Sequence, residues 1–406
     1  MLRSMFSAIS GLRAHQTKLD VAGNNIANVN TVGFKGSQTV FEDTLSQVLR
    51  NGSSPQGETA GTNPAQVGLG VKVAGITTNF GQGSTQNTGR ASDFMISGDG
   101  FFVTKQGNEN LFTRAGSFDL DGVGNLVTPD GAKLQGWTAG PDGTVDVNGT
   151  IGDLRIPSGQ VLAPVATTGF ALGGNLSAGG SATPVTSQIN VYDALGNAHA
   201  VSITMTKQPA DNTWAVAFVD TYGGTQTPLA ATPGTLTFDA DGTLPAGQAP
   251  ITLTGPAGPV TVDLGNLTQF GGKSDAAAKT TPDSGSAMGV LQGYSLSGDG
   301  TIVGSYSNGL KQSLGQLALA TFTNPGGLEK AGNSSFRAAG NAGNPLIGAA
   351  GTGGRGSLTA GALEMSNVDL AEEFTGLIVA QRGFQANSRV ITTSDEILQD
   401  LVQLKR

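Results

Sequence analysis

The chain contains no cysteine and only two histidines, His15 and His199, among its 406 residues. The lack of cysteine excludes disulfides and thiolate chemistry. The two histidines stand far apart in the sequence, and we expect His15 on a solvated helix face and His199 in a turn. A zinc-type site or a Ser-His-Asp triad is therefore disfavoured. We predict no catalytic residue, no metal site and no cofactor, and so no enzyme.

Charge and long apolar runs are also scarce. Charged residues make up 13% of the chain, the formal net charge is −8, and Lys and Arg form no run. Nucleic acid and anionic membranes are therefore poor partners. No window approaches ~18 consecutive apolar residues, so no membrane-spanning helix is predicted. Arg3, Ser4 and Ser7 interrupt the apolar run that a signal peptide would need. The chain reads as cytoplasmic, or as exported without a cleaved signal.

Glycine is abundant instead, with 63 residues, roughly twice the usual share. In the same interior stretch Val, Ile, Leu and Phe alternate with polar residues, which predicts short strands joined by tight turns rather than disorder. Asp-Gly steps suit type I′ hairpin turns and favour an antiparallel meander or barrel. Six such steps begin at Asp99, Asp121, Asp130, Asp142, Asp241 and Asp299.

Apolar residues recur with a heptad spacing at both ends of the chain. This pattern predicts an amphipathic helix over residues 3–28 and a C-terminal helix of ~38 residues, with Ser366 as N-cap and Asp369 completing a capping box. A seven-residue repeat keeps one apolar stripe facing a partner helix, so the ends should pair with each other or with neighbouring copies. The predicted assembly positions are Leu2, Met5, Ile9, Leu12, Leu19, Ile26, Leu370, Phe374, Leu377, Phe384, Ile391, Leu398 and Leu401.

These patterns together predict a mainly β fold with terminal α-helices and a nested, multidomain order. Residues 1–30 and 362–406 would pair in a coiled-coil-like inner domain, and residues 31–70 would form an extended, loop-like connector. Residues 71–144 and 286–361 would form one discontinuous antiparallel β domain. Residues 145–285, rich in Thr, Pro, Ala and Gly, would be an inserted outer β domain.

Acidic residues offer two weaker readings. The segment Asp119–Asp130 partly matches a calcium loop, but Val123 stands where an oxygen ligand is wanted, so a hairpin turn is favoured. Asp93, Asp99, Asp119 and Asp121 could supply the paired carboxylates of a glycosidase, although each also suits a turn. A secreted carbohydrate-active β protein is therefore the alternative from another class. Activity that survives deletion of both ends, without polymer formation by the intact chain, would favour it.

Three blocks of sequence resemble the flagellar rod and hook protein family. The stretch ANVNTVGFK follows the first predicted helix and matches the family's N-terminal signature at Ala27, Asn28, Thr31, Gly33, Phe34 and Lys35. The C-terminal segment beginning SNVDLAEEF is similar to the family's other hallmark, and the block from Gly98 to Trp137 is similar to its first β domain. The three blocks cover roughly a third of the chain, and the stretch 145–285 carries no match.

The resemblance implies a structural subunit of a tubular polymer. Rod members are generally shorter and lack a second outer β domain, so length favours the hook branch, with a distal rod protein as the alternative. The hook branch implies a flexible, curved tube, a universal joint that transmits torque from rod to filament. It also implies type III export and an extracellular place in the flagellum. The partners implied are further copies of the chain, rod and hook–filament junction proteins, a hook cap and the export apparatus.

Overall fold

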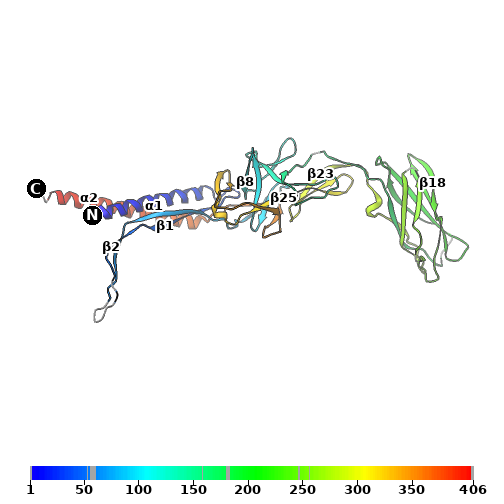
Figure 1. Cartoon of the computed structure of the whole chain (residues 1–406). Coiled ribbons are helices and arrows are strands. Elements are labelled where there is room, and N and C mark those ends of the chain that lie inside the picture. Colours follow the sequence, from blue (N-terminus) through cyan, green and yellow to red (C-terminus); the bar gives the residue numbers. More distant parts are fainter. Residues whose placement is uncertain are drawn as a thin grey trace. The chain divides into compact units, whose positions relative to one another are not determined.

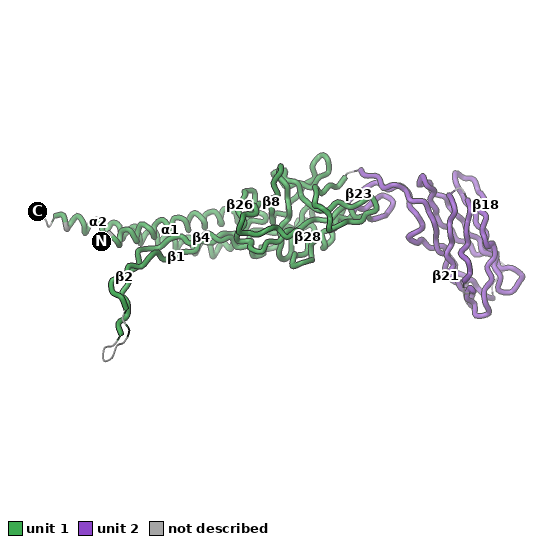
Figure 2. The backbone as a smooth tube through the Cα atoms, in the orientation of Figure 1, with its two compact units in different colours: residues 1–157, 294–303, 312–406 green, residues 158–293, 304–311 purple. Residues whose placement is uncertain are grey.

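The chain is mainly β with one helix at each end (Figure 1). The computed structural model describes residues 2–52, 54, 61–157, 159–179, 183–245, 247–255 and 257–403, and it leaves the side chains of Leu2 and Leu401 undescribed. The chain divides into two compact units (Figure 2). The first comprises residues 1–157, 294–303 and 312–406, and the second comprises residues 158–293 and 304–311. The second unit begins and ends later than the insert expected at 145–285.

The two terminal helices, α1 (Leu2–Ala27) and α2 (Leu370–Gln403), lie side by side in the first unit (Figure 1). They run antiparallel, since Gly11 of α1 faces Asn387 of α2 and the later His15 faces the earlier Gly383. The predicted N-cap of α2 was wrong by three residues. The carboxylate of Asp369, rather than the hydroxyl of Ser366, accepts hydrogen bonds from the amides of Ala371 (2.8 Å) and Glu372 (3.3 Å). An aspartate directly before the helix can reach these first free amides.

Parts of the stretch 36–70, for which low periodicity predicted a loop, are strands, while residues 53 and 55–60 of it lie outside the described residues. The strands are β1 (Ser37–Asp43), β2 (Ser46–Arg50) and β3 (Ala65–Gly68). β1 pairs antiparallel with β4 (Val71–Thr78), and this hairpin packs along α1. β2 pairs with β3 and has no buried residue. Strands stabilised by a distant partner, or exposed on both faces, carry little period-two signal of their own.

The β part of the first unit is built around an antiparallel path β25-β11-β7-β8-β27-β26. Interlocking phenylalanines fill one side of it, with Phe112 and Phe322 at 4.8 Å between ring centroids. The strands of this unit are β5 (Thr85–Asn87), β6 (Phe94–Ser97), β7 (Phe101–Gln106), β8 (Glu109–Thr113), β9 (Asp119–Leu120), β10 (Leu126–Val127), β11 (Lys133–Thr138), β12 (Gly152–Asp153), β25 (Lys311–Thr321), β26 (Glu329–Gly332), β27 (Ser335–Arg337), β28 (Leu346–Ala349), β29 (Ser357–Ala360) and β30 (Ala362–Glu364). β23 (Gly289–Leu296) and β24 (Thr301–Tyr306) extend across the division.

The second unit encloses a separate apolar core. Its strands follow the order β15-β16-β17-β18-β20-β21-β14-β22, and all pairs except β14 with β21 are antiparallel. Trp214, Phe218 and Phe170 are among the side chains that this sheet buries almost completely. The strands are β13 (Val161–Leu162), β14 (Gly169–Asn175), β15 (Val185–Tyr192), β16 (Ala198–Lys207), β17 (Thr213–Tyr222), β18 (Thr225–Thr232), β19 (Thr235–Thr237), β20 (Ile251–Gly255), β21 (Gly258–Thr268) and β22 (Ala277–Lys279).

The Asp-Gly turns are not of type I′. That type needs positive φ at both central residues, and among the described non-glycine residues only Asn212, Asn333 and Ser334 have positive φ. In the loop at Asp142 the amide of Gly143 donates to the carbonyl of Gly140, and Gly143 alone takes φ 78°. The Asp142 carboxylate accepts from the Thr144 amide at 3.1 Å. In this turn the aspartate therefore supplies a side-chain hydrogen-bond acceptor, and the glycine supplies the left-handed backbone conformation.

Candidate assembly surface

Small side chains form the contact between the two terminal helices. Ala8, Ala14 and Ala22 are buried on α1, and Ala380 is completely buried on α2. A Cβ on Gly11 would lie 2.8 Å from the Asn387 side chain, and one on Gly383 would lie 2.5 Å from the His15 ring. The helices therefore approach closely at Gly11 and Gly383. We call these two glycines, Asn387 and the buried small residues of both helices the small-residue seam: Ala8, Gly11, Ala14 and Ala22 with Ala380, Gly383, Asn387 and Ser394.

The large residues predicted to form the helix contact lie beside this seam. Eight of them are half-buried: Met5, Ile9, Leu12, Leu19, Ile26, Leu377, Ile391 and Leu398. Leu370, Phe374 and Phe384 are exposed, at 40%, 51% and 38%. Leu2 and Leu401 lie outside the described side chains. The heptad pattern therefore pointed to residues next to the most buried positions of the two helices. The reason is that a search for large apolar residues gives little weight to Ala and Gly.

Further apolar side chains of the helix pair are exposed within the single chain. They include Phe6 on α1 and, on α2, Ile378, Val379, Val390, Ile397 and Val402, all more than 40% exposed. Contiguous exposed apolar surface on a folded chain marks an interaction site. The helix pair thus presents an apolar surface that the first unit leaves uncovered.

Gly33 ties the segment after α1 to the β part of the first unit. It takes φ 67°, and a Cβ there would lie 2.4 Å from the backbone nitrogen of Ala115. Its amide donates to the carbonyl of Glu364 at 2.8 Å. We expected a special backbone conformation or a close approach at this glycine, and the structure has both. Any side chain here would be strained and would also collide with backbone.

A buried charge cluster lies next to Gly33. The Nζ of Lys35 contacts Oε1 of Glu364 at 2.7 Å, and Nη1 of Arg114 contacts Oε2 at 3.3 Å, with all three side chains at most 3% exposed. Lys35 also donates to the carbonyl of Gly81, and Glu364 accepts from the amide of Gly83. Burial lowers the pKa of Lys35, and the hydrogen bond to Glu364 opposes that shift. The cluster joins four distant segments of sequence, so it fixes where the helix pair leaves the β part.

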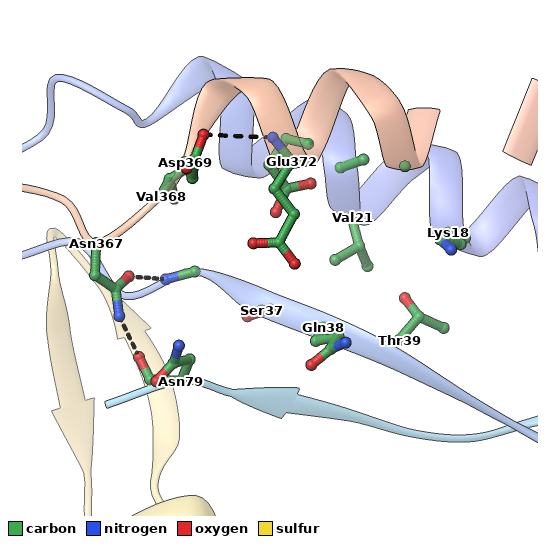
Figure 3. Close-up of a pocket in the computed structure, with 14 residues that line it drawn as sticks. Lys18, Val21, Ser37, Gln38, Thr39, Asn79, Asn367, Val368, Asp369 and Glu372 are labelled. Carbon is green, nitrogen blue, oxygen red and sulfur yellow. Dashed lines mark hydrogen bonds between the residues drawn. The ribbon is translucent and has the colours of Figure 1, made fainter. Parts of the chain in front are cut away.

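Two asparagines complete this joint at the start of α2, beside a recess of about 190 Å³ between α1, β1 and α2 (Figure 3). Asn367 accepts from the amide of Gly36 at 2.9 Å and donates to the carbonyl of Asn79 at 2.8 Å. Asn25 donates to the carboxylate of Glu373 at 2.7 Å and accepts from the amide of Ser37 at 3.0 Å. Asn25 therefore ties the end of α1 to both α2 and β1.

Among the signature residues, Gly33 and Lys35 are buried, Asn28, Thr31 and Phe34 are half-buried, and Ala27 is exposed. Sequence reasoning did not find Asn25, Arg114 or Glu364 as part of the joint. Their partners lie up to 348 residues away, and a single sequence gives no signal for such pairing.

The two histidines contact other side chains of the fold. His199 is not in a turn but buried at the start of β16, where its Nδ1 lies 2.8 Å from Asp220 and its ring stacks on Tyr222. His15 does not face solvent either, since its ring packs edge-on against Phe41 and its pKa is lowered, mainly by burial. The sequence around these histidines is polar, and it gives no sign that Phe41 packs on His15 or that Asp220 and Tyr222 contact His199.

The acidic candidates also lie in turns and ion pairs. β9 and β10 pair antiparallel, which confirms the hairpin expected at Asp119–Asp130. Asp93 accepts from the Thr88 hydroxyl at 2.6 Å, and Asp119 contacts Arg90. In the part of the chain that the structure describes, no group of three or more His, Cys, Asp or Glu side chains could hold a metal ion. Nor does any described helix combine the length and apolarity needed to cross a bilayer.

Comparison with known proteins agrees with this architecture. Family models match a flagellar basal body rod segment at residues 5–35, the flagellar hook protein FlgE/F/G D1 domain at 95–205, the flagellar basal body protein FlaE D2 domain at 178–282, and the rod FlgEFG C-terminal segment at 359–404. The hook protein FlgE of Borreliella burgdorferi is 39% identical, with complete coverage of both chains. The chain belongs to the flagellar hook protein family.

Both hook and rod proteins are similar to this chain over nearly its whole length. The hook protein FlgE of Escherichia coli K12 is 39% identical over 98% of this chain and 99% of that one. The rod protein FlgG of Bacillus subtilis is 33% identical over the full length of both. Residues 5–27 of α1 and the whole of α2 fall within the matched rod segments, which also contain the exposed apolar residues described above.

Proposed function

We propose that the chain is the structural subunit of the bacterial flagellar hook, and that its copies assemble through the terminal helix pair into a flexible, curved tube. The observation that carries this proposal is the apolar surface left on α1 and α2. α2 has 34 residues, and several of its large apolar side chains remain about half exposed, so the single chain does not bury its apolar face. Packing against other copies would cover that surface.

We assign different proposed roles to the terminal segments and to the β parts between them. Residues 1–30 and 362–406 form the assembly region, in which Met5, Ile9, Leu377 and Ile391 contact other copies. The β parts, including the inserted one, form the outer body. Glycine-rich surfaces with few charges make few fixed ion pairs, which suits lateral contacts that slide as a tube bends.

The proposed location is the flagellar hook outside the cell, reached by export. The proposed partners are copies of the same chain, with rod and hook–filament junction proteins at the two ends of the tube. Membership in the hook protein family and the match to rod segments at both ends support these assignments. The hook cap and the export apparatus are further proposed partners.

Electron microscopy of the purified full-length chain under polymerising conditions tests the proposal. Curved tubes are the expected result. Straight, rigid tubes would instead favour a distal rod protein. A chain that stays monomeric at all concentrations and salt conditions would refute a self-assembling subunit.

A further inference from the structure

Charges are segregated along the helix pair. Arg13 of α1 lies level with Arg382 and Arg389 of α2, because Gly11 faces Asn387 and His15 faces Gly383. All three arginines are exposed. We call this set the basic belt. Near the joint, α2 begins with three acidic residues, Asp369, Glu372 and Glu373, which we call the acidic end.

Both sets are without ion pairs in the part of the chain that the structure describes, since none joins the three arginines or the three acidic residues to an opposite charge. Asp369 caps its own helix, and Glu373 accepts from Asn25, so both carboxylates are held in place. Lys18 of α1 lines the same recess as Glu372 and Glu373, and the Nζ of Lys330 donates to the Ser37 hydroxyl at the same joint.

Apolar surface lies between the belt and the acidic end. Phe374, Ile378 and Val379 are 51%, 56% and 56% exposed. The centres of the two charged sets are about 14 residues apart along α2, or roughly 21 Å at ~1.5 Å per residue. A partner displaced by that length along the helix axis would cover the apolar segment and place opposite charges face to face.

We propose that charge sets the axial register between copies: the basic belt of one copy docks on the acidic end of the next, offset by roughly 21 Å along the helix pair. The inference rests on the proposed function, because it describes how the assembling helices align. Apolar contacts supply attraction that tolerates many registers, whereas like charges in a wrong register repel.

The distal end of the helix pair is the poorer match for the belt. It carries Asp395, Glu396 and Asp400, but Arg3 lies at the same end of α1. The acidic end is assigned as the partner because the apolar side chains between it and the belt, Phe374, Ile378 and Val379, are 51–56% exposed. On the distal side of the belt, Val390 and Ile397 are 42% and 44% exposed.

Charge reversal in the full-length chain tests the register. The double variant Arg382→Glu/Arg389→Glu should raise the critical concentration for tube formation at least ~10-fold, because acidic groups would then face each other. Adding Glu372→Arg to that variant should recover part of the loss. The matched control is Lys273→Glu/Lys311→Glu, which makes the same change in net charge at exposed positions of the second unit and should leave the critical concentration unchanged.

The outcomes separate the inference from the proposed function. If the unaltered chain forms no tubes, the proposed function fails. If it forms tubes and the belt variant assembles equally well, the charge register alone is overturned. The same holds if the triple variant assembles no better than the belt variant, or if the control variant is impaired as strongly. Circular dichroism of each variant monomer must match that of the unaltered chain, which keeps misfolding from imitating the expected result.

Discussion

The second unit and the terminal helix pair treat their large apolar side chains in opposite ways. In the second unit, Trp214, Phe218 and Ile203 are at most 1% exposed, inside a sheet that uses only residues of that unit. On the helix pair, small residues fill the internal contact, while Phe374 and Ile378 remain more than half exposed. The second unit completes its core alone, whereas in the proposed assembly the helix pair completes its core only with other copies. The predictions below test this difference.

The largest expected effect comes from Gly33→Val at the joint. A β-branched residue at φ 67°, with backbone 2.4 Å from its Cβ, should cost about 3 kcal/mol or more of folding free energy in the first unit. Tube formation should fail, while the second unit keeps its own core. Urea unfolding followed by tryptophan fluorescence and far-UV circular dichroism measures this. Val32→Ala is the control, and an equal effect of both variants would contradict the role given to Gly33.

The next largest effect falls on assembly rather than folding. Leu377→Asp and Ile391→Asp place a carboxylate on half-buried positions beside the small-residue seam. Burying that carboxylate between copies would cost several kcal/mol per subunit, so tubes should not form. The free chain should keep its β circular dichroism signal, and sedimentation should find it monomeric. Normal tubes from either variant would show that these positions face solvent in the assembly.

Removing most of the second unit should have a smaller effect on assembly. Val165 and Ser286 form a pair of backbone hydrogen bonds, at 3.0 and 2.9 Å, and the unit's core lies between them in sequence. Replacing residues 166–285 with a short Gly-Ser linker therefore closes a loop whose ends already meet. Electron microscopy should still find tubes, since the helix pair is unchanged. An unfolded variant would show that the first unit depends on the core that was removed.

The smallest effect is a shared response to acid. Asp121 in the first unit and Asp193 in the second accept the same hydrogen bonds, from the amides two and four residues ahead and from the Asn125 or Asn197 side chain. The asparagine amide is the main cause that lowers the pKa of each carboxyl. A depressed carboxyl pKa stabilises the fold above the unfolded value of ~3.9, and that gain is lost as pH falls through the folded pKa.

NMR measurement of the side-chain carboxyl chemical shifts of Asp121 and Asp193 would check both titrations. The pH would be varied over roughly 2–6, which includes the range in which free carboxyls titrate. Asp121→Asn and Asp193→Asn should each remove the acid dependence of their own turn and leave the other unchanged. A midpoint at or above the ordinary value for either residue would contradict the structural account of these turns.

The sequence predicted those features that depend on local pattern. The terminal helices, the antiparallel β interior and the hairpin at Asp121 follow from periodicity and turn chemistry. The small-residue seam escaped notice because Ala8, Gly11 and Ala380 add nothing to an apolar count. No pattern in the sequence indicates the cluster of Lys35, Arg114 and Glu364, because Glu364 lies 329 residues from Lys35 and 250 residues from Arg114. β1 was missed for the same reason, because its partner and its covering helix lie elsewhere in sequence.

Hydrogen–deuterium exchange on free chain and sedimented tubes tests the central claim most directly, that the helix pair completes its core only between copies. Amides of α1 and α2 should exchange fast in the monomer, because an amphipathic helix with half its apolar surface exposed opens readily, and they should become strongly protected in the tube. Amides of β16 and β17 should be equally protected in both states. Equal protection of α1 and α2 in monomer and tube would contradict the account.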